Sequence, residues 1–229
     1  MNIRILGGAH EIGGNCIELE TKGQRLLLDL GRPLSAGPDD DVPLPRVNGL
    51  GTGDDTSLLG IVVSHGHLDH YGLLERAHPN VPVFMGEAAA RILAEAAFFL
   101  RNPVVPKPTA FLRDGQDLDI GPFRVRPHLV DHSAFDAYAL EVEADGQKVF
   151  YTGDLRGHGR RRPCSRGCST TLPGRWTSCC ARRRTCARTT RPPARSGPKR
   201  TWRTGSSRRS KPRRGSRSWR SRSRTSIVW

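Results

Sequence analysis

The stretch LLGIVVSHGHLDH, residues 58–70, decides the fold class. It opens with a continuous apolar run rich in β-branched residues, which predicts a strand buried on both faces. Imidazole nitrogen and carboxylate oxygen are zinc ligands, and in an extended segment His65 and His67 point the same way. The stretch therefore predicts a metal site at the end of a buried strand, rather than a solvated histidine-rich turn. The four metal-competent side chains are His65, His67, Asp69 and His70.

The segments around this stretch are predicted to alternate between strands and helices. Short β-rich runs separated by glycine turns predict an antiparallel meander at the start, and residues 87–100 have the apolar spacing of a helix that covers one sheet face. Residues 35–56 are rich in Gly, Pro and Asp, so a long loop that borders the site is expected there. Together these elements predict an α/β fold. The expected strands are residues 2–6, 15–20, 25–30, 118–127, 138–143 and 148–152.

Three motifs, in order, resemble those of the metallo-β-lactamase superfamily. HGHLDH resembles its HxHxDH signature, VDHSAFDAYAL places His132 at its next metal-binding histidine, and YTGDLR places Asp154 at the carboxylate that bridges two metals. In LLLDLG, Asp29 corresponds to an aspartate that supports the site from behind the ligands. The resemblance implies an αββα metallo-β-lactamase sandwich, of which this chain would hold the N-terminal half only.

The same resemblance implies a site with two zinc ions. Two ions roughly 3.5 to 4 Å apart can activate a water molecule and polarise a phosphoryl or carbonyl oxygen, so no protein nucleophile is needed. One zinc would be held by His65, His67 and His132, the other by Asp69 and His70, with Asp154 between them. The catalytic residues would be Asp69, His70 and Asp154.

Two local phrases favour the nuclease branch of the superfamily. LGGAHEIGGNCIEL, residues 6–19, resembles the start of ribonuclease J and other β-CASP nucleases, and HSAFD followed by a hairpin and TGD resembles their third and fourth motifs. The resemblance thus implies phosphodiester hydrolysis of RNA. Phe135 and its neighbour Ala134 stand where that branch commonly has a proline. Hydrolysis of a small ester, lactone or thioester is the alternative within the same fold.

Several further polar residues have weaker claims. His10, His78, His128 and His158 are each expected to be structural or exposed. His10 is the strongest candidate of the four, because the resemblance implies that the Gly-rich opening borders the metals. Glu11 and Asp136 are candidates for partners that orient a ligand imidazole.

Charge divides the chain into two unlike regions. Residues 1–155 carry all 22 acidic residues and 13 Lys plus Arg, a net charge of −9, whereas residues 156–229 carry 24 basic residues and no acidic one. The net charge of +15 therefore describes neither region. Cys16 is the one thiol of the first region, which indicates a reducing compartment. Without a secretory signal or an apolar run of about 18 residues, a cytoplasmic protein with no membrane contact is expected.

The expected domain boundary lies between residues 1–159 and 160–229. The second region is Arg, Ser, Thr, Pro, Gly and Cys with almost no apolar periodicity, so disorder is expected. An out-of-frame translation explains it best: regrouping its codons turns Cys into Leu, Val or Met and residues 162–171 into AALFEGLLDD, an amphipathic helix start. A nucleic-acid-binding basic arm and an irregular zinc knuckle are the alternatives.

The out-of-frame interpretation bears on activity. The superfamily normally completes its second metal site with a late histidine, and no histidine follows His158. For the chain as written, an inactive form of a metal-dependent hydrolase is therefore one expectation. The rival function is a non-enzymatic nucleic-acid binder that acts through the basic region.

Overall fold

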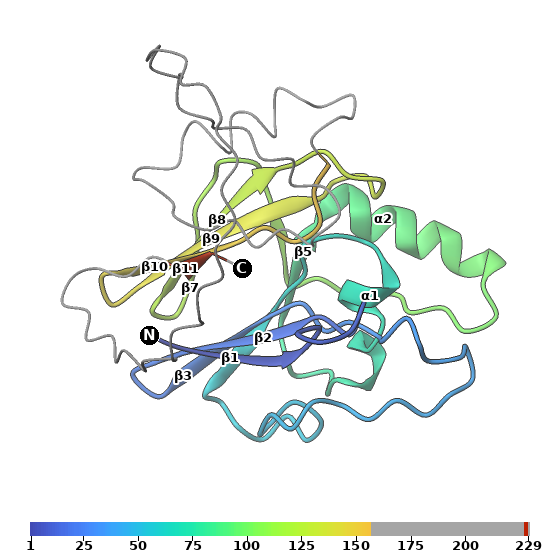
Figure 1. Ribbon diagram of the computed structural model, residues 1–229, viewed down its shortest axis with the longest axis horizontal. Coiled ribbons are helices and arrows are strands. Elements are labelled where there is room, and N and C mark those ends of the chain that lie inside the picture. Colours follow the sequence, from blue (N-terminus) through green and yellow to red (C-terminus); the bar gives the residue numbers. More distant parts are fainter. Residues whose placement is uncertain (157–226, 229) are drawn as a thin grey trace, which may run out of the picture.

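The structure is a computed structural model that describes residues 1–156 and 227–228. Two β-sheets form its framework, and Figure 1 shows them as a blue-to-cyan layer and a yellow layer. The interpretations of residues 160–226, including the frameshift, the basic arm and the zinc knuckle, lie outside the described residues. Within the described part of the chain, no helix has the length and apolar character needed to cross a membrane.

The first sheet has six strands in sequence order. Its first three strands are antiparallel, as the turn signals predicted, and the remaining strands continue in parallel. The strands are β1 (Asn2–Gly7), β2 (Cys16–Thr21), β3 (Gln24–Leu28), β4 (Leu58–Val62), β5 (Val83–Gly86) and β6 (Ala110–Leu112). The last two are short and had no clear sequence signal.

The second sheet has the order β11-β10-β9-β8-β7. It is antiparallel except for β11, which pairs with β10 in parallel. Its strands are β7 (Leu118–Ile120), β8 (Phe123–Leu129), β9 (Tyr138–Ala144), β10 (Gln147–Tyr151) and β11 (Ile227–Val228). The single strand expected over residues 118–127 is two strands, because Gly121 turns the chain with a φ of 56°.

Helices are few. They are α1 (Leu68–Tyr71), α2 (Glu87–Ala96) and the 3₁₀ turns η1 (Leu74–Arg76) and η2 (Ala97–Phe99). The helix expected over residues 87–100 therefore ends earlier as an α-helix and closes in a 3₁₀ turn. Figure 1 shows α2 leaving the end of β5 and running beside the sheets.

The core has two parts because the inner strands of the first sheet, β2 to β5, are buried on both faces. Leu26 and Leu28 face the second sheet, where Phe123 and Leu140 pack against them. Leu27, between them in sequence, faces the opposite way, into a cluster that contains residues of α2 and of the long loop. Burying a leucine side chain stabilises by about 2 kcal/mol, so this alternation holds the sheets face to face and the helix on the outer side.

Candidate metal centre

The HGHLDH segment lies at the carboxyl end of β4. The chain leaves the strand after Val62, and α1 begins three residues beyond His65. The His70 amide donates to the carbonyl of His67 at 2.8 Å, which closes this short turn. His65, Asp69 and His70 are buried. The turn therefore folds three imidazoles and a carboxylate back towards one point.

Three imidazoles form the first group of potential ligands: His65, His67 and His132. His67 Nδ1 is 3.2 Å from His65 Nε2 and 3.0 Å from His132 Nε2. In a tetrahedral zinc site with Zn–N bonds of 2.0–2.1 Å, ligand nitrogens are about 3.3 Å apart. The spacing of these nitrogens therefore fits a divalent ion of zinc's size.

The second group consists of His65, His70 and Asp154. His70 Nε2 is 3.7 Å from Asp154 Oδ1 and 3.6 Å from Asp69 Oδ2. The other carboxylate oxygen of Asp154 faces the first group, 4.0 Å from His132 Nε2. Asp154 thus presents one oxygen to each group, and His65 belongs to both, whereas the motif resemblance had assigned His65 to a single zinc.

Asp29 anchors the turn from behind. Its carboxylate is fully buried and accepts hydrogen bonds from the Ser64 amide at 2.7 Å, the Ser64 hydroxyl at 2.9 Å and His70 Nδ1 at 2.6 Å. The Tyr151 hydroxyl, from β10 in the other sheet, donates to it at 2.5 Å. Because His70 Nδ1 carries the proton that Asp29 accepts, its Nε2 keeps the lone pair that a metal requires.

Three supporting residues were not singled out from the sequence: Ser64, Tyr151 and Asn15. The Ser64 hydroxyl lies 3.0 Å from His65 Nδ1, so it can accept the proton of that ring and leave Nε2 free. Asn15 Nδ2 donates to the Asp69 carbonyl at 3.0 Å and lies 3.0 Å from His70 Nε2. Their position beside the motifs is the only sequence signal they carry.

The surroundings of His67 and His132, in the first ligand group, favour the neutral form of the imidazole. Burial lowers the pKa of His67 and lowers that of His132 to about 4, so both rings are neutral at neutral pH. Burial also disfavours the charged form of His70, but Asp29, Asp69 and Asp154 outweigh it and raise the pKa of that imidazole. Metal ligation requires neutral imidazole, which His67 and His132 already provide.

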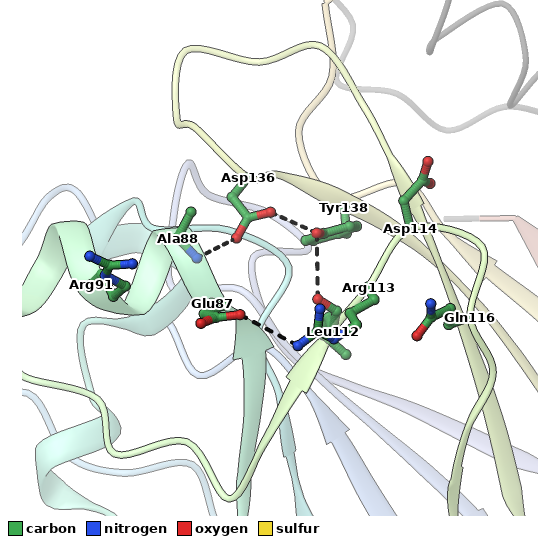
Figure 2. Close-up of a pocket in the computed structure, with 9 residues that line it drawn as sticks. All are labelled: Glu87, Ala88, Arg91, Leu112, Arg113, Asp114, Gln116, Asp136 and Tyr138. Atoms are coloured by element: carbon green, nitrogen blue, oxygen red, sulfur yellow. Dashed lines mark hydrogen bonds and ion pairs between the residues drawn. The ribbon is translucent and has the colours of Figure 1, made fainter.

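The weaker candidates lie elsewhere. His10 and Glu11 are exposed and belong to neither group of ligands. Asp136 does not meet a ligand imidazole in any contact given by the structure; its carboxylate accepts from the amides of Ala88 and Ala89 at the start of α2. Figure 2 shows Asp136 between α2 and Tyr138 at the wall of a surface pocket.

A two-sheet α/β sandwich with histidines and aspartates gathered at one strand end defines a metal-binding domain. The family described as "Beta-lactamase superfamily domain" matches residues 36–173. That match spans more than half of the chain, and the chain belongs to this family.

The curated relatives of this chain include a ribonuclease J. The chain is similar to ribonuclease J of Mycobacterium tuberculosis, 31% identical over 163 residues that cover 68% of this chain and 28% of that protein. It is also similar to transcription termination factor FttA of Methanothermobacter thermautotrophicus, 41% identical over 172 residues that cover 66% and 27% of the two chains. The chain thus spans less than a third of the length of these relatives.

A solved structure supports the fold. The crystal structure of a protein of unknown function from Enterococcus faecalis V583 has a TM-score of 0.61 and 22% identity, covering 73% of this chain and 46% of the other. The family match implies divalent metal binding, and the two ligand groups are residues of the described part of the chain that could provide it.

Proposed function

We propose that this chain carries the metal centre of a hydrolase that cleaves phosphodiester bonds in RNA with two zinc ions. The observation that carries the proposal is the pair of ligand groups that share His65 and face opposite oxygens of Asp154. Similarity to ribonuclease J supports RNA as the substrate class. The family match supports hydrolysis.

Each group has a defined part in this proposal. His65, His67 and His132 would hold one ion, and His70, Asp69 and Asp154 would hold the other, while the single lone pair on His65 Nε2 would bind one of the two ions. When bound, the ions lower the pKa of water and polarise the scissile phosphoryl oxygen. Asp29 keeps the proton of His70 on Nδ1, and Asp154, whose two carboxylate oxygens face His70 and His132, would serve as a ligand beside both groups.

A serine next to the ligands offers a rival nucleophile. Ser133 Oγ lies 3.5 Å from His67 Nε2, at the limit of a hydrogen bond. In the two-metal account this hydroxyl takes no part in bond cleavage. The variant Ser133→Ala is therefore expected to keep the activity of the wild type, whereas a serine-dependent reaction would lose it.

The test is an assay of the zinc-loaded chain on end-labelled RNA and, in parallel, on a small ester, a thioester and a lactone. RNA cleavage that stops on chelation, returns with zinc and is lost in His65→Ala supports the proposal. Turnover of a small substrate without RNA cleavage would replace it by the alternative activity of the same fold. Salt-sensitive RNA binding with no zinc-dependent cleavage would favour the non-enzymatic binder.

A further inference from the structure

The ligand loop of residues 130–137 differs from the HGHLDH turn in how its histidine is held. His132 Nδ1 is buried and has no hydrogen-bond partner among the described residues. A metal-binding histidine usually donates its second ring N–H to a carboxylate or carbonyl, which fixes the orientation of the ring. The position of His132 therefore depends on how the backbone of its loop is anchored.

Asp136 provides an anchor at the far end of that loop. Its Oδ2 accepts from the amides of Ala88 at 3.0 Å and Ala89 at 3.2 Å, the second and third residues of α2. The Tyr138 hydroxyl donates to Oδ1 at 2.6 Å, so both oxygens are used. Figure 2 shows Asp136 bound between the helix and the tyrosine. The loop is thereby tied to α2 across 47–48 positions of sequence.

The start of α2 is built to receive this carboxylate. Gly86, which precedes the helix, has no side chain that could cap it, and the amides of Ala88 and Ala89 are the donors that a capping side chain normally satisfies. A Cβ at Gly86 would lie 2.1 Å from Asp136 Oδ2, so only glycine leaves room for it. Asp136 also has a φ of 62°, a conformation that aspartate tolerates better than most residues. Two positions far apart in sequence are thus adapted to one contact.

We propose that Asp136 is a positioning residue that fixes His132 for metal binding by capping α2 from the ligand loop. The inference rests on the proposed metal site. Other backbone contacts also hold the loop: the Val130 amide donates to the Ala137 carbonyl at 2.9 Å, and the Tyr138 amide to the Ser64 carbonyl at 2.9 Å. These contacts fix the base of the loop next to the strands, whereas Asp136 fixes the arm that follows His132.

Zinc affinity of the full chain, measured by competition with a chromophoric chelator, tests the inference. Asp136→Ala is expected to lower the affinity by roughly 10- to 100-fold, the usual effect of losing a partner behind the ligands. Asp136→Asn keeps an acceptor and the backbone preference, and is expected to stay within about threefold of the wild type. Glu87→Gln is the matched control, because this carboxylate lies in the same first turn and pairs with Arg113 instead.

A second variant separates positioning from helix stability. In Gly86→Ser/Asp136→Ala, serine caps α2 from within its own chain segment. The aspartate leaves most of the space that the new Cβ needs, and the Tyr138 ring, 3.0 Å from that Cβ, must shift by a few tenths of an ångström. Loss of the cap is expected to lower the Tm of the metal-free single variant by roughly 2–4 °C, and the double variant should recover it. Zinc affinity should remain low in the double variant, because residue 136 still has no carboxylate to link the loop to α2.

The outcomes are distinct. The inference would be overturned if Asp136→Ala bound zinc as tightly as the wild type. It would also be overturned if the double variant recovered both its Tm and its zinc affinity. Either result would leave the metal site intact. A wild-type chain that binds no zinc would contradict the proposed function itself, and the inference with it. In the wild type, zinc addition should shift the ¹H–¹⁵N signal of the His132 ring. Absence of this zinc-induced shift in Asp136→Ala and in the double variant, and in no other chain, supports the inference.

Discussion

The HGHLDH turn and the loop of residues 130–137 supply ligands to the same centre, but they are built differently. In the turn, the second nitrogens of His65 and His70 have partners in Ser64 and Asp29. In the loop, His132 has no such partner among the described residues, and Asp136 ties the loop to a helix. The turn is therefore preformed by buried side chains, whereas the loop depends on a remote contact.

The largest expected effect comes from removing the ligand that the two groups share. His65→Ala should abolish high-affinity zinc binding at the group with His67 and His132, a loss greater than the 10- to 100-fold typical of residues behind the ligands, and should also weaken the neighbouring group, which His65 borders. Zinc content after equilibrium dialysis measures it. The control is His10→Ala, an exposed histidine outside both groups, which should retain the zinc of the wild type. Equal zinc content in the two variants would refute His65 as a metal ligand.

The next effect tests whether the turn is preformed. Asp29→Asn leaves the size of the side chain unchanged but replaces a buried carboxylate that accepts from Ser64, His70 and Tyr151. The metal-free chain should lose about 3 kcal/mol of unfolding free energy, because donors around a buried charge lose their acceptor. Urea unfolding measures the loss. Asp119→Asn, an exposed carboxylate paired with Arg124, should change stability by less than about 0.5 kcal/mol.

A smaller effect tests the hydrogen bond that links the two sheets. Tyr151→Phe removes only the hydroxyl that donates to Asp29 and should cost about 1–2 kcal/mol of unfolding free energy. Asp29 keeps its bonds to Ser64 and His70, so zinc affinity should fall less than in Asp29→Asn. If Tyr151→Phe lowered zinc affinity as much as Asp29→Asn, the turn would depend on the second sheet and the contrast with the loop would disappear.

The sequence predicted the parts of the fold that depend on local pattern. The apolar run before Ser64 is a buried strand, the opening meander is antiparallel, and the motif residues converge at one strand end. The α/β class and the superfamily are confirmed. The short strands β5 and β6 gave no clear signal, because four and three residues are too few to show a period.

The contacts behind the ligands could not be predicted in the same way. Tyr151 reaches Asp29 across 122 positions of sequence, and this meeting depends on how the two sheets pack. Asp136 was considered a partner for a ligand imidazole, yet its carboxylate caps a helix. Sequence motifs identify ligand chemistry, whereas the partners that orient ligands are set by tertiary packing.

Anomalous scattering from crystals of the zinc-loaded chain would locate the metals directly. Two zinc peaks are expected, one among His65, His67 and His132 and the other beside His70 and Asp154, with the carboxylate of Asp154 between them. A single peak, or zinc bound away from these side chains, would contradict the proposed two-metal centre.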